Sequence, residues 1–446
     1  MGDSTQKGAM FMAGLTLLQS LRVALTGAKF ALDRFKIPQQ NVSSFINMVH
    51  NPMELATFTG MAIVTITALI KKPKDDESKK YFRSLAMFTN IALCCSFVVL
   101  LYAFTSGGEQ GDLTFYYWTI VFGSFIYGMN VAAVMTAASA DASLFNVGIP
   151  LSGIQVSVYY FVFTKWAEWR NWSNVSFWII FWQLIIAILI SAVSAALWIY
   201  LAVKGGGTDG GGGGQSSSVV ASPILMGMVG MGGIYAFYPA IAPYKLTDVG
   251  TGYTIDLVVL FMSAVPGIII AILCLYNKGP NQDWSSAPGW HAAWILAFPH
   301  ITAMILCFFT LHYPDSGVAS SIKGSGLKVG VITVTLKFCE EGLKAVSYAG
   351  AFGAIYSPVN AFLSQGLMIV LAFTGDGYLK TYSKYEHDRD KWPTKDFGTL
   401  RSIWFWTWNG VSEACKSVKS SFTTNVRCKV LGKSEALLIV YADEEF

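Results

Sequence analysis

Long apolar stretches separated by short polar loops dominate the chain. Eleven such stretches, most of them about 20 residues long, fall into two groups: six between Gly8 and Val203, and five between Ser222 and Phe373. A helix needs about 20 apolar residues to cross the hydrocarbon core of a bilayer. The stretches are continuous rather than alternating, which favours helices over spanning strands. We therefore predict an all-α polytopic membrane protein with about 11 transmembrane helices in a 6+5 arrangement.

A glycine- and serine-rich run divides the two groups of helices. Its composition is typical of a flexible linker, and it lacks both the lysine and the preceding strand of a phosphate-binding loop, so ATP-driven transport is not indicated. The predicted organisation is a six-helix bundle at 1–203, a cytosolic linker at 204–221, a five-helix bundle at 222–375 and a polar tail at 376–446.

The short loops predict the orientation of the helices. The loop from Lys71 to Arg83 carries six basic residues in thirteen, whereas the loop from Thr105 to Asp112 carries none. The positive-inside rule places the first loop in the cytosol, together with the N-terminus and the Gly/Ser run. Asn41, Asn171 and Asn174 begin Asn-X-Ser sequons in loops that this count places outside, so they are candidate glycosylation sites.

The tenth stretch, from Leu327 to Gly350, differs from the others because it carries charges in its interior. At 3.6 residues per turn, Lys337, Glu340, Glu341 and Lys344 share one face of a helix. The i,i+4 spacing lets opposite charges neutralise each other. Such a helix lines a watery cavity or lies flat on the membrane. The first alternative gives eleven crossings and an outside C-terminus; the second gives ten crossings and a cytosolic tail.

The composition agrees with a membrane protein. Hydrophobic residues make up 53% of the chain and charged residues 13%, against roughly 25% charged in soluble proteins. The net charge of +4 gives no indication of nucleic-acid binding. Neither the cysteines nor the histidines have metal-ligand spacing, and no catalytic constellation is present. We therefore predict no enzyme activity, metal or cofactor; the expected partners are the lipid bilayer and a small polar solute.

Polar side chains at lipid depth are the remaining candidates for a site, because they are costly there and mark pathways. Besides the charged face of the tenth stretch, we single out Gln19, Asn130, Gln155 and Asp256 as candidates for substrate binding or the pathway. For any one amide, hydrogen bonding between helices is the alternative. Asp256 lies near the start of its stretch, where a capping or interfacial role is equally open.

Three segments resemble a known family. Gly128–Ser139, Pro150–Val156 and Tyr238–Pro243 are similar to segments of the equilibrative nucleoside transporters, which share the major facilitator fold. The sequence from Tyr238 to Ile270 also resembles the multi-spanning Tpr-related proteins of piroplasm parasites. The resemblance implies a facilitative transporter of nucleosides or similar small polar solutes. It would work by alternating access, and we expect it in the plasma membrane.

Two departures from that family support a second hypothesis. Its eighth helix usually carries an Asp and an Arg one turn apart, but no Arg or Lys occurs here from Leu257 to Asn277. Its Pro-Trp-Asn pattern in the first helix is also missing, and Gln19 is the nearest polar residue. The alternative is a transporter-derived membrane surface protein without transport activity, kept for host interaction or antigenic variation.

Overall fold

The protein is described here from a computed structural model. The structure covers residues 2–24, 27–38, 41–73, 75–205, 217–239, 241–386 and 391–431, which are called the described residues below. Within these ranges the chain is helical and contains no strand. The N-terminal half consists of α1 (Gly2–Leu17), α2 (Gln19–Ala24), α3 (Ala28–Arg34), α4 (Val42–Lys71), α5 (Asp76–Thr105), α6 (Leu113–Ala137), the 3-10 helix η2 (Ser139–Asp141), α7 (Ala142–Arg170) and α8 (Val175–Lys204). The C-terminal half consists of α9 (Ser217–Gly232), α10 (Ile234–Phe237), α11 (Val249–Leu275), the 3-10 helix η3 (Pro288–Leu296), α12 (Ala297–His312), α13 (Gly317–Lys323), α14 (Gly326–Gly350), α15 (Tyr356–Tyr385), α16 (Thr399–Ser421) and α17 (Val426–Leu431).

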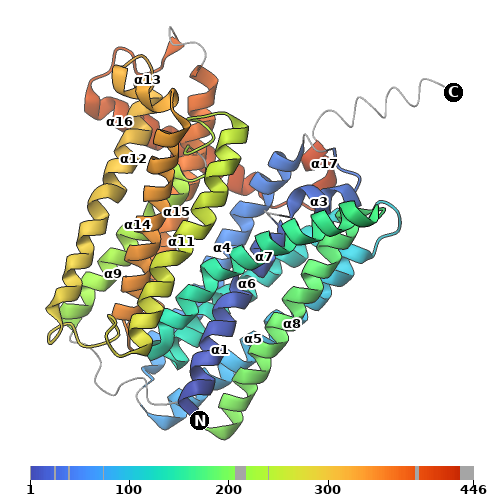
Figure 1. Ribbon diagram of the computed structural model, residues 1–446, viewed down its shortest axis with the longest axis vertical. Coiled ribbons are helices and arrows are strands. Elements are labelled where there is room, and N and C mark those ends of the chain that lie inside the picture. The colour runs from blue at the N-terminus through green and yellow to red at the C-terminus, as the bar shows by residue number, and fades with distance from the viewer. Residues whose placement is uncertain are drawn as a thin grey trace.

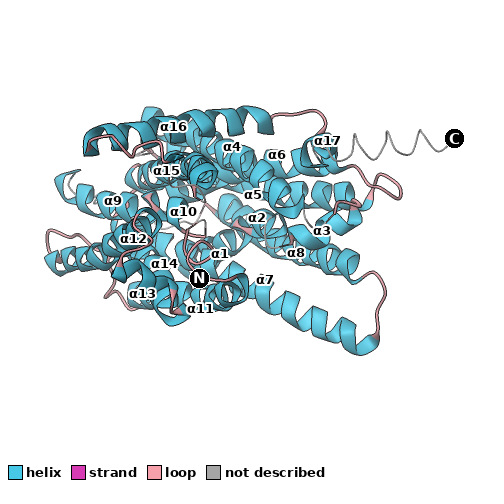
Figure 2. Cartoon of the chain, turned by 90° about the horizontal axis from the view of Figure 1, so that it is seen from above, coloured by secondary structure: helices cyan, strands magenta, loops and turns pink. Residues whose placement is uncertain are grey.

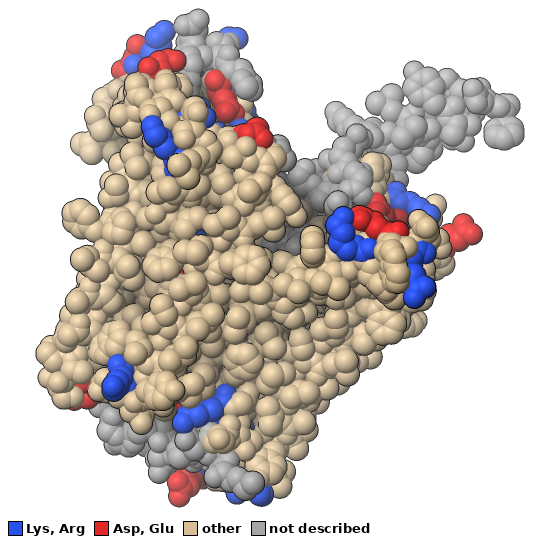
Figure 3. All heavy atoms as spheres, viewed as in Figure 1, with Lys and Arg blue, Asp and Glu red and all other residues tan. Residues whose placement is uncertain are grey.

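The helices form two bundles with an apolar belt. Among the described residues, nine helical segments are long and apolar enough to cross a membrane. The first and tenth predicted stretches are not among them, because α1 and α2 are separate short helices and α14 carries four interior charges. On the face shown in Figure 3, Lys, Arg, Asp and Glu gather toward the two ends of the molecule, and the surface between them is almost free of charged residues. This arrangement confirms the predicted all-α polytopic fold.

The path of the chain bears on whether the tenth stretch, now α14, crosses the membrane or lies flat on it. α14 packs inside the C-terminal bundle against α9, α11 and α12 rather than lying across its end (Figure 1). The Arg83 side chain donates a hydrogen bond to the Gly205 carbonyl at 2.8 Å, so the basic loop and the start of the Gly/Ser run lie at one end. α17 lies at the opposite end of the molecule (Figure 1). The course of α14 through the bundle is the one that the eleven-crossing alternative expects.

Some boundaries differ from the sequence-based expectation. α9 begins at Ser217, within the predicted linker 204–221, and α15 continues to Tyr385, beyond the predicted end of the bundle at 375. Most of the Gly/Ser run, 206–216, lies outside the described residues. Small polar residues such as serine can form the first turn of a helix whose later turns are apolar. Composition alone therefore did not predict where α9 begins.

The first helix of each bundle is interrupted. α1 ends at Leu17 and α2 begins at Gln19, while α9 ends at Gly232 and α10 begins at Ile234. Discontinuous helices in corresponding positions of two halves are typical of transporters, in which they place polar groups near the bilayer midplane. Both interruptions direct side chains toward the space between the bundles, as described below.

Close glycine packing holds α4 against α6. A Cβ atom on Gly128 would lie 1.9 Å from the Thr57 carbonyl oxygen, and one on Gly60 would lie 2.2 Å from that of Phe125. Small residues allow helices to approach this closely, and packing rather than hydrophobicity holds helices together in lipid. Gly128 therefore has a structural role in the N-terminal bundle.

We expect Gly128→Ala to destabilise the protein by about 1–3 kcal/mol, because the added methyl group collides with backbone that cannot rotate away. Thermal unfolding of the purified protein in detergent measures the loss. Gly123→Ala on the same helix is the matched control, since its Cβ would meet nothing closer than the Ser96 hydroxyl at 3.5 Å. Equal unfolding temperatures for the two variants would contradict the packing argument.

The polar tail is folded rather than extended. α16 crosses α15 where a Cβ on Gly377 would lie 1.9 Å from the Gly410 carbonyl oxygen, and Trp406 is buried at this crossing. Seen from above, α16 lies lengthwise whereas α15 is viewed end-on (Figure 2). Trp404 and Trp408 stack on each other on the exposed side of α16, as interfacial tryptophans do.

The end of the tail reaches the N-terminal bundle. Val426 and Val430 are buried in that bundle's hydrophobic core near α3, α4 and α6. The Trp118 indole donates a hydrogen bond to the Thr423 carbonyl at 3.0 Å, and the Arg427 guanidinium donates one to the Phe35 carbonyl at 2.6 Å. Residues 399–431, which we call the C-terminal segment, therefore join the two bundles at the end opposite the N-terminus.

Candidate functional site

The four charged side chains of α14 form a compact network. Lys337 forms an ion pair with Glu340 and lies 3.5 Å from a Glu341 carboxylate oxygen. The Lys344 ammonium lies 2.6 Å from Glu341 and 3.5 Å from Glu340. Glu340, Glu341 and Lys344 are each no more than 5% exposed. The structure thus brings all four predicted residues together in a network whose charges cancel.

The short helix α2 supplies polar groups from the N-terminal bundle. The Gln19 amide donates a hydrogen bond to the Gln155 side-chain oxygen on α7 at 2.9 Å, which joins two of the predicted residues. The Arg22 guanidinium lies against Gly153, where a Cβ atom would be 2.6 Å from Nη2. Among the described residues, Arg22 forms no ion pair, and its Nε atom has no hydrogen-bond partner.

A buried carboxyl group on α4 faces the C-terminal bundle. Glu54 is 7% exposed; the His50 ring nitrogen lies 3.7 Å from one of its oxygens, and the Gln365 amide on α15 lies 3.5 Å from the other. The His50 ring also contacts the Tyr235 ring of α10 edge-on, with centroids 6.1 Å apart. Glu54 and His50 are therefore at the interface of the two bundles.

Three tyrosines lie between these charged groups. Tyr127 on α6 and Tyr235 on α10 each interact electrostatically with both Arg22 and Glu54. The ring of Tyr238 lies 5.8 Å from the Lys337 ammonium. Arg22, Glu54, these tyrosines and the α14 network are polar groups contributed by both bundles. We call this set the inter-bundle polar layer.

Sequence reasoning missed Arg22 and Glu54 as members of this layer. Each lies in a largely apolar stretch with few other charges, so neither produces a polar face that periodicity detects. The available signal was their depth in the stretch, because an ionisable residue within a membrane helix marks a functional site by default. Gln155, by contrast, reaches the layer only through Gln19.

Two predicted residues lie elsewhere. The Asn130 amide donates a hydrogen bond to the Thr89 hydroxyl at 3.1 Å inside the N-terminal bundle, which is the helix-to-helix alternative. The Asp256 carboxylate accepts a hydrogen bond from the Tyr244 hydroxyl at 2.5 Å, near the end of α11 where that helix begins. Asp256 does not cap α11; Asp248 does, through the Thr251 amide at 2.9 Å.

The bundles also meet at the N-terminal end of the molecule. There the Gln6 amide donates a hydrogen bond to the Asp141 carboxylate at 2.8 Å. Across the interface, Ser143 of α7 and Cys274 of α11 line the same cavity. The cavity is polar and has a volume of ≈ 210 Å³. Direct contacts between α7 and α11 thus separate the polar layer from this end.

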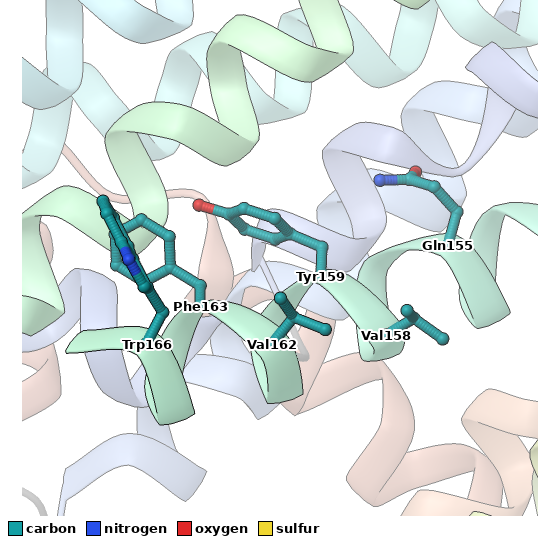
Figure 4. Close-up of a pocket in the computed structure, with 6 residues that line it drawn as sticks. All are labelled: Gln155, Val158, Tyr159, Val162, Phe163 and Trp166. Carbon is teal, nitrogen blue, oxygen red and sulfur yellow. The ribbon is translucent and has the colours of Figure 1, made fainter. Parts of the chain in front are cut away.

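A larger groove of ≈ 530 Å³ lies along α7 and is almost entirely apolar (Figure 4). It is lined by Gln155, Val158, Tyr159, Val162, Phe163 and Trp166. Val158 and Val162 are exposed on the surface, and the Tyr159 hydroxyl is already bonded to the Ile179 carbonyl at 2.8 Å. A groove on one helix with such walls suits lipid chains, so we locate the candidate site in the polar layer instead.

The three sequons differ in accessibility. The Asn41 amide nitrogen, the atom that would carry a glycan, donates a hydrogen bond to the Val430 carbonyl at 2.8 Å. Asn171 and Asn174 are exposed in the loop between α7 and α8. When the protein is made in human cells, we expect a glycosidase-sensitive mass shift that survives Asn41→Gln and is lost in the Asn171→Gln, Asn174→Gln double variant. Loss of the shift in Asn41→Gln alone would contradict this assignment.

Comparison with known proteins identifies the fold. No family model and no curated protein matches the chain. It is similar to the structure of XylE, a proton:xylose symporter of the major facilitator superfamily, with 11% identity, a TM-score of 0.50 and coverage of 93% of this chain and 95% of that one. It is also similar to a bacterial homologue of the iron transporter ferroportin in an outward-facing state, with 9% identity, a TM-score of 0.50 and coverage of 95% and 99%.

These similarities show a major facilitator fold for an integral, multi-pass membrane protein. Both matched proteins are transporters rather than enzymes. At identities this low, the comparison supports the fold alone. The nucleoside-transporter and Tpr-related parts of the resemblance are not confirmed by it.

Proposed function

We propose that this chain, with its major facilitator fold, is a facilitative membrane transporter for nucleosides or similar small polar solutes. The observation that supports the proposal is the inter-bundle polar layer. Its groups come from both bundles, from the interrupted first helices and from α14. Polar and ionisable groups are costly at this depth and are retained where they contact a solute or water.

Alternating access follows from the two-bundle architecture. The bundles rock about a midplane site, so that the layer faces one side of the membrane and then the other. The α14 network moves as a unit, because both lysines and both glutamates belong to one helix and their charges cancel within it. The solute therefore meets a preformed site. The charges of this site cancel, so no uncompensated charge moves through the bilayer with α14.

The same layer suits the hydrogen-bonding pattern of a nucleoside. Tyr127 and Tyr235 offer aromatic faces for a base, and the Gln19 side-chain oxygen has no partner among the described residues. A buried acceptor without a partner and aromatic rings in the same layer match a ligand with hydroxyl donors and a flat apolar part. Adenosine is therefore the first solute to test.

The test is uptake of labelled adenosine, with other small solutes in parallel, by the purified full chain in liposomes at several pH values. We expect saturable flux that is strongly reduced by Glu341→Gln. Glu168→Gln is the matched control, because Glu168 is 59% exposed at the end of α7. Absence of flux for every solute from correctly folded protein would favour the alternative, a transporter-derived surface protein without transport activity.

We also propose a plasma-membrane location with the C-terminus outside. An epitope tag after Phe446 should be accessible to antibody on intact cells, and a tag within 206–216 only after permeabilisation. If both tags were on the same side of the membrane, the eleven-crossing topology would be wrong. If the tagged protein were found only in internal membranes, the plasma-membrane location would be wrong.

A further inference from the structure

One fully buried amide lies where the two bundles touch. Asn146 of α7 is 0% exposed, and neither its Oδ1 nor its Nδ2 atom has a hydrogen-bond partner among the described residues. Buried amides are normally bonded at both ends, because a group that leaves water without gaining a partner loses its hydration and receives nothing in return. Asn146 therefore destabilises the conformation in which the structure shows it.

Contacts at two levels show how α7 and α11 meet. Near the N-terminal end of the molecule, Ser143 and Cys274 line the same cavity. Further along both helices, a Cβ atom on Gly267 would lie 3.8 Å from the Asn146 amide nitrogen. The helices are therefore antiparallel, and Asn146 faces the other bundle. We call this contact of α7 with α11 the α7–α11 seam.

The surroundings of Asn146 explain why it lacks a partner. On α11, Pro266 has no backbone N–H to donate, and the neighbouring Gly267 has no side chain. On the other side, α7 packs so closely on α1 that a Cβ atom on Gly14 would lie 2.0 Å from the Phe145 carbonyl oxygen. This packing fixes the rotation of α7 about its own axis and holds the Asn146 amide in the seam.

We propose that Asn146 acts in the transport cycle by disfavouring the closed α7–α11 seam. When the bundles rock and the seam parts, water reaches both ends of the amide, so the penalty of burial is lost. Asn146 then acts through the position of the helices and not by touching the solute. This inference rests on the alternating access of the proposed function and adds a residue that keeps its two states close in free energy.

An apolar residue of similar shape should have the opposite effect. Leucine branches at the same carbon as asparagine but carries two methyl groups in place of the amide oxygen and nitrogen. We expect Asn146→Leu to raise the unfolding temperature of the purified full chain in detergent by about 2–4 °C, because the unpaired amide is removed.

Asn90 of α5 provides the matched control. It is 1% exposed, but its amide nitrogen donates a hydrogen bond to the Ala86 carbonyl at 2.8 Å, and its oxygen accepts one from the Ser194 hydroxyl at 2.8 Å. Asn90→Leu should therefore lower the unfolding temperature, because it leaves a buried hydroxyl without its acceptor.

Two native cysteines report whether the seam opens. Cys274 is 6% exposed and lines the cavity between the bundles, whereas Cys307 of α12 is 0% exposed in the hydrophobic core. A maleimide reaches Cys274 when the seam parts, but it reaches Cys307 only when the protein unfolds. Peptide mass spectrometry of the labelled full chain separates the two rates.

Asn146→Leu and Asn146→Ala should each slow the labelling of Cys274 roughly 5- to 30-fold relative to that of Cys307, the change expected for one unpaired amide. The alanine variant removes the amide without adding volume, so the effect cannot come from a tighter fit of leucine. Asn146→Asp should speed the labelling of Cys274, because a carboxylate is more costly to bury. A purely structural role would leave the ratio of the two rates unchanged.

These measurements need no solute, so they test Asn146 separately from the proposed function. An unchanged ratio of labelling rates would overturn the inference. Destabilisation of Asn146→Leu to the same extent as Asn90→Leu would also overturn it, since the amide would then be bonded in the closed seam. If the ratio changes as expected but liposomes take up no solute, the proposed transport is wrong and the effect of Asn146 on the seam stands.

Discussion

Lys344→Met is expected to destabilise the protein by about 3–5 kcal/mol, because it leaves a buried carboxylate without its partner. The Lys344 ammonium lies 2.6 Å from Glu341, and both side chains are less than 10% exposed. In the variant, Lys337 alone must balance two carboxylates. Unfolding of the purified protein in detergent micelles measures the difference.

Two further variants make this prediction specific. The Lys344→Met, Glu341→Gln double variant restores neutrality and should recover most of the lost stability, since the Lys337–Glu340 pair remains. Lys165→Met removes an ion pair with Glu168 of similar spacing in which both side chains are about 60% exposed, and exposed pairs contribute only about 0–1 kcal/mol. If the double variant were as unstable as Lys344→Met, the network would stabilise the protein through side-chain packing rather than through charge balance.

Ser143→Cys is expected to produce a disulfide with the native Cys274 and to stop transport under oxidising conditions. The two side chains line one cavity at the interface of the bundles, and a disulfide forms where Cβ atoms lie about 3.5–4.5 Å apart. A covalent bond there prevents α7 from moving away from α11, which the second half of the transport cycle requires. Uptake in liposomes should fall almost to background and return on reduction.

The control for this experiment removes the partner thiol. Ser143→Cys combined with Cys274→Ala should transport equally well before and after oxidation, which excludes effects of the other cysteines. Full uptake by protein that mass spectrometry shows to be completely cross-linked would contradict a moving interface at this position.

The sequence was sufficient where a feature repeats with a helical period. The charged face of α14 follows directly from the spacing of Lys337, Glu340, Glu341 and Lys344. Length and hydropathy likewise predict the transmembrane helices, because the bilayer requires about 20 apolar residues in each. These properties are local to one helix and need no knowledge of its neighbours.

Properties that depend on neighbouring helices were not predictable. Asn130 and Gln19 are both single amides in apolar stretches, yet Asn130 faces Thr89 within its own bundle and Gln19 faces α7 near Arg22. The direction of a side chain depends on how the helix is rotated in the bundle. The role of Glu54 depends in addition on α10 and α15, which lie far away in the sequence.

The C-terminal segment was predictable only as polar and aromatic. Over the whole polar tail, 376–446, eleven Lys and Arg stand against ten Asp and Glu, so charge did not indicate which side of the membrane the tail occupies. Its position follows from the close contact of Gly377 with Gly410 and from the burial of Val426 and Val430. These contacts join parts of the chain that no sequence pattern relates.

The anchoring of the C-terminal segment has a consequence for how the molecule is held together. α16 belongs to the C-terminal bundle through α15, whereas α17 is embedded in the N-terminal bundle. If the chain were divided within 206–216 and the two halves were expressed together, we therefore expect the halves to stay associated. The contacts that hold them lie at the end opposite the cut. Because α16 also contacts α4 directly, the C-terminal segment limits how far the bundles part at that end.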